Sequence, residues 1–262
     1  MRRERAPIWI AILAAIGAAF FVVPLIGLVV KTPWGDALQS LTSTDTLEAL
    51  KLSLIASLSA TAVSLVLGVP LAWIYARIDF PGRTVLRALT TLPMVLPPVV
   101  GGIALFLAFG RRGLVGSLLD TTFGITLPFT TAGVVFAETF VAMPFLVLTV
   151  EAGLRSMDRR YEDAARTLGA RRWTVFTRVT LPLIAPSLFA GAVLCWARAL
   201  GEFGATITFA GNFPGVTQTM PLAVYLLLES NHPEGSFILS LLLLLVSLAV
   251  LVGLRHRWLG SA

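Results

Sequence analysis

The sequence has 262 residues, of which 56% are hydrophobic and only 13% are charged, and its mean hydropathy is +0.87. Soluble domains usually carry about 25% charged residues, so this composition excludes an ordinary soluble domain. A net charge of +6 would suggest nucleic acid binding in a soluble chain. In a membrane protein, basic residues instead mark the loops that stay in the cytoplasm. We therefore interpret residues 1–262 as a single transmembrane domain.

Six apolar segments are long enough to cross a membrane as helices, which takes about 20 residues each. They lie at about residues 8–30, 52–76, 88–110, 130–150, 183–206 and 236–254. The first segment follows three arginines, as a signal peptide would, but its apolar run is too long for a signal core and no clear cleavage site follows. The uncharged stretch 203–228 is broken by glycine and proline. We expect it to form an external loop and a short helix at about 221–228, and no seventh span.

The distribution of basic residues predicts the orientation. With the N-terminus in the cytoplasm, 15 of the 20 basic residues lie on cytoplasmic segments, four lie outside and Arg198 lies within a span. The positive-inside rule favours this arrangement. Six spans then place both termini, and the long connection 155–182, in the cytoplasm.

The third predicted span contains residues that disturb a regular helix. They are Pro93, Pro97, Pro98, Gly101 and Gly102. The prolines lack backbone donors, and the glycines allow another helix to approach closely. We expect a kinked helix whose free carbonyl groups are satisfied by neighbouring protein or by water in a cavity. Two interpretations stay open: a helix that lines a pathway or its gate, and a kinked packing helix.

The connection 155–182 between the fourth and fifth spans is polar and favours helix up to Gly169. Ala164, Ala165 and Leu168 form a small apolar face at helical spacing. Connections of this length are usually ordered and often functional. One interpretation is a helix on anionic lipid, or simply a topology signal. The small residues favour a close approach by another protein instead.

This connection resembles the cytoplasmic EAA loop of binding-protein-dependent ABC importers, which reads Glu-Ala-Ala, three residues, Gly, nine residues, Ile-x-Leu-Pro. Its positions are filled here by Asp163, Ala164, Ala165, Gly169, Val179, Leu181 and Pro182. The departure is Asp163 in place of the usual Glu, with Glu162 one residue earlier. Either carboxylate could therefore fill the role of the acid.

The resemblance implies an all-α integral membrane protein with the type I ABC importer permease fold: six transmembrane helices and a cytoplasmic coupling helix. The implied ATPase-docking residues are Glu162, Asp163, Ala164, Ala165 and Gly169. The implied partners are a second copy of this subunit, two ATP-binding-cassette ATPase subunits and an extracytoplasmic oxyanion-binding protein. The implied location is the bacterial cytoplasmic membrane.

The sequence gives no reason to expect catalysis by this chain. It contains no Walker phosphate loop, so we expect ATP hydrolysis by a partner subunit. The single cysteine, Cys195, lies in an apolar stretch, and His232 and His256 are far apart, so we expect no cofactor and no metal site.

Two further segments, 92–102 and 197–221, resemble the molybdate permease branch of this family. Sulfate permeases share a Gly-Glu-Phe/Tyr-Gly segment, but the continuation Ala-Thr-Ile-Thr-Phe is more similar to molybdate permeases. The resemblance implies translocation of molybdate, with tungstate not separated and with sulfate, thiosulfate or another oxyanion as the alternative. A secondary transporter would show inverted repeats, and a membrane-embedded enzyme would show converging acids, His or Cys; neither pattern is evident.

Three charges lie at membrane depth: Glu138, Arg198 and Glu202. Each costs at least about 2.5–3.5 kcal/mol there, so we expect Arg198 and Glu202, four residues apart, to pair. A structural ion pair, a gate contact and a direct anion contact stay open for this pair. Glu138 is protonated, paired or bonded to hydroxyl groups of a neighbouring span. The predicted pathway or gate residues are Pro97, Pro98, Gly101, Arg198, Glu202, Thr206 and Thr208.

Overall fold

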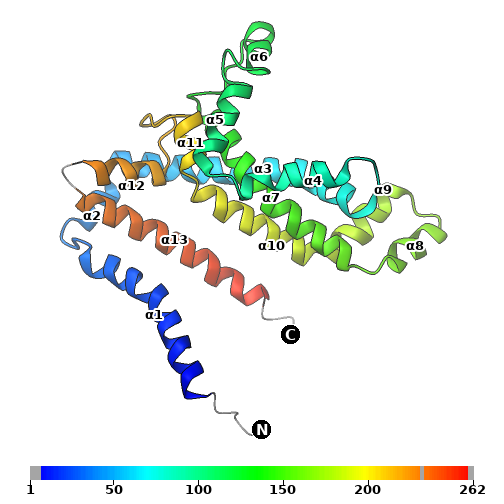
Figure 1. Cartoon of the computed structure of the whole chain (residues 1–262), viewed down its shortest axis with the longest axis horizontal. Coiled ribbons are helices and arrows are strands. Elements are labelled where there is room, and N and C mark those ends of the chain that lie inside the picture. Colours follow the sequence, from blue (N-terminus) through cyan, green and yellow to red (C-terminus); the bar gives the residue numbers. More distant parts are fainter. Residues whose placement is uncertain (1–6, 231–232, 259–262) are drawn as a thin grey trace. The chain divides into compact units, whose positions relative to one another are not determined.

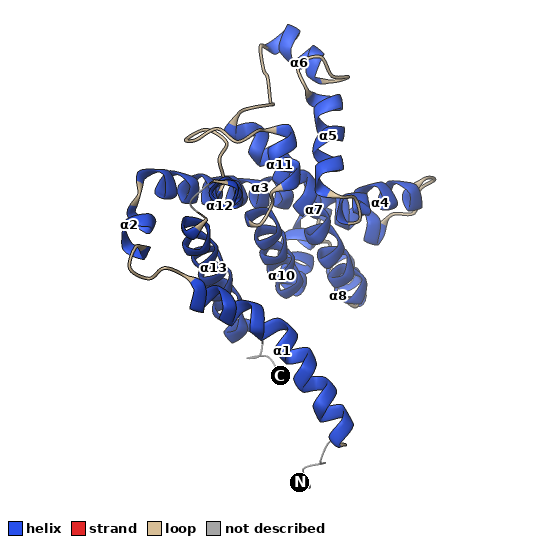
Figure 2. Ribbon diagram, turned by 60° about the vertical axis from the view of Figure 1, so that its left-hand side comes forward, coloured by secondary structure: helices blue, strands red, loops and turns tan. Residues whose placement is uncertain are grey.

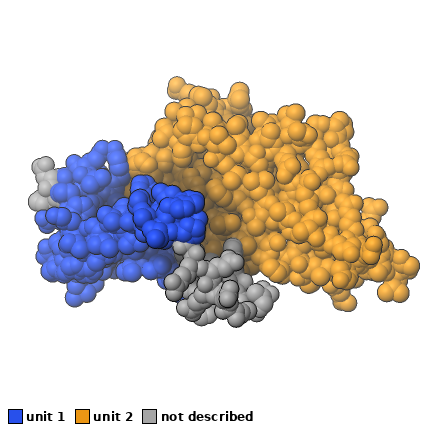
Figure 3. Space-filling model, turned by 60° about the horizontal axis from the view of Figure 1, so that its bottom comes forward, with its two compact units in different colours: residues 1–47, 223–262 blue, residues 48–222 orange. Residues whose placement is uncertain are grey.

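The computed structural model describes residues 7–230 and 233–258, which are largely helical and contain no strand (Figures 1 and 2). The chain divides into two compact units, coloured separately in Figure 3. Unit 1 consists of residues 1–47 and 223–262, and unit 2 consists of residues 48–222. The residues expected to carry function all lie in unit 2.

Unit 1 contains α1 (Ile8–Lys31), α2 (Ala37–Thr42) and α13 (Glu234–Trp258), and both α1 and α2 contact α13. No residue of α1 is buried, and its 24 residues are apolar up to Lys31. Apolar side chains exposed all around a helix are typical of a segment that faces lipid. The helix α12 (Met220–Glu229) begins in unit 2 and continues into unit 1.

Unit 2 is built around the packing of three long helices. Its elements are α3 (Thr44–Arg77), α4 (Arg83–Thr91), η1 (Leu92–Met94), α5 (Pro98–Phe109), α6 (Gly116–Phe123), α7 (Thr131–Ser156), α8 (Arg160–Thr167), α9 (Arg172–Val175), η2 (Phe176–Thr180), α10 (Leu181–Leu200) and α11 (Gly204–Phe209). The helix α7 packs along α10, and a Cβ atom on Gly153 of α7 would lie 2.4 Å from Ser187 Oγ of α10. Tyr75, Leu146 and Cys195 are fully buried in the core between α3, α7 and α10.

Among the described residues, four helical segments are long and apolar enough to cross a membrane. They are Ile8–Lys31, Thr44–Arg77, Thr131–Ser156 and Arg172–Leu200. They contain the first, second and fourth predicted spans and most of the fifth, so the chain is a multi-pass membrane protein. The sixth predicted span falls within α13, and the short helix expected at 221–228 is α12.

The third predicted span, expected to be a kinked helix, is divided into two helical segments. The segments Arg83–Met94 and Pro98–Phe109 are bent by 119° relative to each other. Pro97 has extended backbone, with ψ 129°, and neither it nor Pro98 can donate a backbone hydrogen bond. The two consecutive prolines therefore separate α4 and η1 from α5.

The fifth predicted span also ends earlier than expected. The helix α10 stops at Leu200, and a break at residues 201–203 separates it from the short helix α11. The prediction of a continuous helix to residue 206 is therefore wrong. Glycine on both sides of the break, at Gly201 and Gly204, lowers the helix propensity there.

Candidate functional site

The helices α5 and α11 pack against each other where the third and fifth predicted spans are interrupted (Figures 1 and 2). Their backbones approach so closely that a side chain would not fit. A Cβ atom on Gly102 would lie 1.7 Å from Thr208 Oγ1 and 2.8 Å from the carbonyl oxygen of Ala205. A Cβ atom on Gly204 would lie 2.8 Å from Pro98 Cβ. The two segments that resemble molybdate permeases therefore meet in one place.

A pocket of about 260 Å³ lies beside this contact. It is lined by Pro98, Val99, Arg198, Gly201, Glu202, Phe203 and Gly204. Arg198 Nη2 lies 2.5 Å from Glu202 Oε2, and the two side chains are 27% and 1% exposed. The second oxygen of Glu202 accepts a hydrogen bond of 2.8 Å from the backbone N–H of Ala205 and so caps the start of α11. The ion pair is thus formed across the break after α10 and not along a continuous helix.

The other predicted pathway residues surround the pocket without lining it. Pro97 directly precedes α5 at the bend. Gly101 faces α7, since a Cβ atom there would lie 3.2 Å from the Phe140 ring. Thr208 donates its hydroxyl to a carbonyl oxygen one turn earlier in α11, at 2.8 Å. Thr206 is buried, and its hydroxyl has no hydrogen-bond partner among the described residues.

Glu138 is a second buried acid in this region. It lies on α7, its side chain is buried, and its Oε2 has no hydrogen-bond partner in the described part of the chain. The carboxyl group of Glu202 is close enough to interact with it electrostatically. Unit 2 therefore places two acids and one cation, Arg198, near the contact between α5 and α11.

The connection 155–182 contains the short helix α8, whose two neighbouring acids have different environments. The Glu162 side chain is 6% exposed, and its Oε1 lies 3.4 Å from Arg77 Nη2 at the end of α3. The same oxygen accepts a hydrogen bond of 2.7 Å from Thr180 Oγ1 in η2. The Asp163 side chain is 67% exposed and pairs with Arg166, one turn later. Glu162 therefore attaches α8 to the spans, whereas Asp163 points outward.

Several apolar side chains are exposed on α8 and the chain after it, among exposed arginines. Tyr161, Leu168 and Trp173 are exposed, and Ala164 is exposed between them. The helix ends at Thr167, and Gly169 follows with φ +83°, a left-handed conformation that favours glycine. The exposed part of α8 therefore presents both charged and apolar side chains.

Glu151, near the end of α7, is a buried acid that the sequence analysis missed. Its carboxylate lies 3.0 Å from Arg87 Nε and 2.7 Å from Arg155 Nη2. Glu151 and Arg155 lie four residues apart at the end of an apolar run, a spacing that predicts an ion pair on a helix. The sequence could therefore have revealed this pair, though not Arg87. The contribution of Arg87 depends on the bend that directs α4 back toward α7.

Solved structures show which fold the chain shares. The chain superimposes on a bacterial ABC transporter for import of the acidic polysaccharide alginate with a TM-score of 0.73, at 20% identity over 95% of this chain and 94% of that one. An alginate transporter in complex with a pentasaccharide-bound periplasmic protein gives a TM-score of 0.75 at 18% identity, over 97% of this chain and 94% of that one. The chain therefore shares its fold with a chain of each of these transporters.

Sequence comparison identifies the family of the chain. The family described as binding-protein-dependent transport system inner membrane component matches residues 64–259, and the chain belongs to it. The chain is 46% identical to the molybdenum transport system permease protein ModB of Mycobacterium tuberculosis, over 96% of this chain and 94% of the relative. The corresponding Escherichia coli protein is 44% identical over 81% and 93%. The sulfate transport system permease protein CysT of Escherichia coli is 38% identical over 85% and 81%.

These relatives confirm the family that the sequence motifs predict. As a member of this family the chain is a transport component and not a catalyst, in a binding-protein-dependent ABC importer of the inner membrane.

Proposed function

We propose that this chain is the transmembrane permease subunit of an ATP-driven importer that translocates molybdate. The observation that carries the proposal is the 46% identity to a molybdenum permease over 96% of the chain. The sulfate permease is less similar, at 38% identity. Sulfate or thiosulfate remains the second candidate, and tungstate is expected to share the molybdate route.

The proposal is tested with the reconstituted importer. The permease, its ATPase subunit and its binding protein are assembled in liposomes, and ATP hydrolysis is measured with the binding protein loaded with molybdate, tungstate or sulfate. We expect molybdate and tungstate to stimulate hydrolysis and uptake, and sulfate to leave both near the basal level. Equal or greater stimulation by sulfate would contradict the proposed substrate.

The proposed assembly contains two copies of this subunit, two ATPase subunits and one extracytoplasmic binding protein. In this assembly α8 is the coupling helix, and its exposed face around Ala164 and Ala165 contacts the ATPase. The support is the arrangement of two acids on α8: Glu162 contacts Arg77 of α3 and Thr180 of η2, while Asp163 is exposed and pairs with Arg166 on the same helix. A displacement of α8 would therefore be transmitted to α3 and to the start of α10.

The proposed topology has six spans with both termini in the cytoplasm. We assign the six crossings to the four long helices, to the bent pair as one crossing, and to α13. The arginines within the connection 155–182 support a cytoplasmic position for α8, because cytoplasmic loops are rich in basic residues.

The proposed gate is the contact between α5 and α11, with the Arg198–Glu202 pair at its side. The bend before α5 and the break before α11 allow these two short helices to shift without unfolding a complete span. Because Glu202 neutralises Arg198, we propose that the pair holds the gate in position and does not bind the anion. This assignment is distinguished from a direct anion contact by the variants described in the Discussion.

A further inference from the structure

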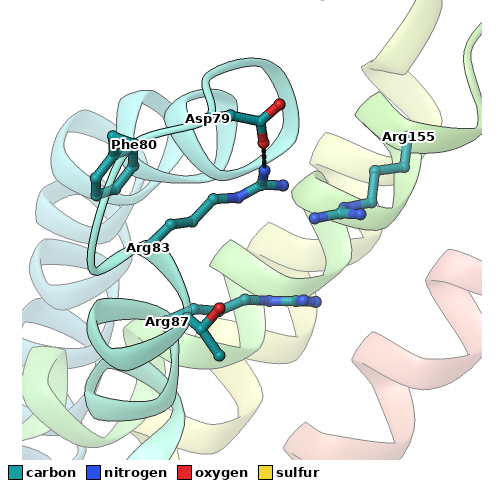
Figure 4. Close-up of a pocket in the computed structure, with 6 residues that line it drawn as sticks. Asp79, Phe80, Arg83, Arg87 and Arg155 are labelled. Atoms are coloured by element: carbon teal, nitrogen blue, oxygen red, sulfur yellow. Dashed lines mark hydrogen bonds and ion pairs between the residues drawn. The ribbon is translucent and has the colours of Figure 1, made fainter.

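A pocket of about 380 Å³ lies where the end of α3, the start of α4 and the end of α7 meet. It is lined by Asp79, Phe80, Arg83, Thr84, Arg87 and Arg155. In Figure 4 the guanidinium groups of Arg83 and Arg155 point toward one another, and the Arg87 side chain extends toward the same space. Three cations from two helices therefore surround one opening.

Glu151 holds two of these arginines in place. Its side chain is 1% exposed, whereas those of Arg87 and Arg155 are 43% and 45% exposed. A guanidinium group has five N–H donors, so each arginine keeps donors that the buried carboxylate does not use. Glu151 therefore orients Arg87 and Arg155 from the protein interior, and their remaining N–H donors are open toward the pocket.

Arg83 is held by contacts with residues at and just after the end of α3. It pairs with the carboxylate of Asp79 and donates to the carbonyl oxygen of Tyr75 at the end of α3. The Asp79 side chain is 95% exposed, so water screens its charge strongly. Counting Asp79 and Glu151 against the three arginines leaves the group with a net charge of +1. Planar guanidinium groups at fixed positions match the oxygens of a phosphate group.

The opposite face of α4 is apolar. Val85, Leu86 and Leu89 are exposed and lie three and four residues apart, so they share one side of the helix. Arg83 and Arg87 share the other side. The helix α4 is the first segment of the bent pair, so its basic start at Arg83 lies at the membrane surface while its apolar face is turned toward lipid. A free oxyanion would bind the arginines but would make no contact with the apolar side of α4.

We propose that this pocket binds the phosphate group of an anionic phospholipid, with Arg83, Arg87 and Arg155 on its oxygens. The pocket lies at the ends of two spans, α3 and α7, which is the level of lipid headgroups. A zwitterionic headgroup is disfavoured because its own cation would be repelled by the arginines. The proposal depends on the chain being a membrane protein and is independent of the transported substrate.

The test measures which lipid stays with the importer. The complete complex is exchanged into vesicles of phosphatidylcholine with or without phosphatidylglycerol, and the lipid retained after purification is quantified by mass spectrometry. We expect phosphatidylglycerol to be enriched over phosphatidylcholine. Arg83→Gln should lower this enrichment about fivefold, the effect of removing one basic residue at a lipid surface. Arg83 is chosen because Glu151 keeps both of its partners in this variant.

A matched control is available in the same unit. Arg111 pairs with Asp120 at 2.9 Å, as Arg83 pairs with Asp79, but it lies in the connection between α5 and α6. Arg111→Gln removes the same charge and should leave the enrichment unchanged. Equal losses in both variants would mean that only overall charge matters, and the pocket would not be a site.

A second measurement covers the case in which Arg83→Gln does not assemble. Phosphatidylglycerol should protect the pocket arginines of the unmodified complex from phenylglyoxal, whereas inorganic phosphate and molybdate should not. Equal protection by either free anion would identify a free oxyanion and overturn the lipid assignment. Loss of the ATPase subunit from Arg83→Gln, with unchanged lipid enrichment, would identify a protein-docking surface and overturn it as well.

Discussion

The Arg198–Glu202 pair gives the sharpest test of the proposed gate, because a structural pair and a direct anion contact predict opposite results. Glu202 is 1% exposed and holds both Arg198, at 2.5 Å, and the N–H of Ala205, at 2.8 Å. Arg198→Ala leaves this carboxylate with one neutral donor at membrane depth. Breaking a buried pair in this way costs about 3–5 kcal/mol, a large part of the stability of a domain. We expect a strong loss of assembled subunit.

Removal of the acid should cost less. Arg198 is 27% exposed toward the pocket and can be reached by water when Glu202 is replaced by Ala. The loss of the cap on α11 adds about 0.5–2 kcal/mol. The double variant Arg198→Gln with Glu202→Gln is neutral and keeps an amide oxygen for the Ala205 N–H. It should recover much of the assembly and of the uptake.

The assay combines the yield of the detergent-solubilised complex, its thermal unfolding and molybdate uptake in proteoliposomes. Rescue of assembly and of uptake together would support a structural pair that positions the gate. A double variant that assembles fully and transports nothing would refute this reasoning and place Arg198 in direct contact with the anion.

Three further predictions concern α8 and the orientation of the chain. Gly169→Val should cost about 1–2 kcal/mol through its φ of +83°, and should lower uptake and ATPase association while the subunit still inserts; normal uptake would contradict the docking assignment. Glu162→Gln should uncouple ATP hydrolysis from uptake, because it releases α8 from Arg77 and Thr180. The matched variant Asp163→Asn, at an exposed position, should keep the free energy of unfolding within about 0.5 kcal/mol of the unmodified protein. Uncoupling by Asp163→Asn and not by Glu162→Gln would show that Asp163 is the anchoring acid. A cysteine at Arg160 should react with an impermeant thiol reagent only in inside-out vesicles, and labelling from the outside would exclude the proposed topology.

The sequence alone determined the class and the family of this protein. Long apolar runs must form helices in a membrane, since every backbone polar group has to be satisfied within the segment. The spacing from Asp163 to Pro182 carries the family resemblance without any tertiary information. The apolar runs and the motif spacing are both properties of the succession of residues along the chain, which is why they could be predicted. The prolines at positions 97 and 98 also predicted a kink in the third span, though not its size.

The tertiary structure decided which residues share a site. The 119° bend before α5 and the break after Leu200 bring Pro98 and Glu202 to one pocket, although about a hundred residues separate them. The same bend carries Arg87 back to Glu151. The structure also distinguishes Glu162 from Asp163, adjacent acids that the motif could not separate. On a helix, neighbouring residues point about 100° apart, so only the position of α3 and η2 determines which carboxylate is buried.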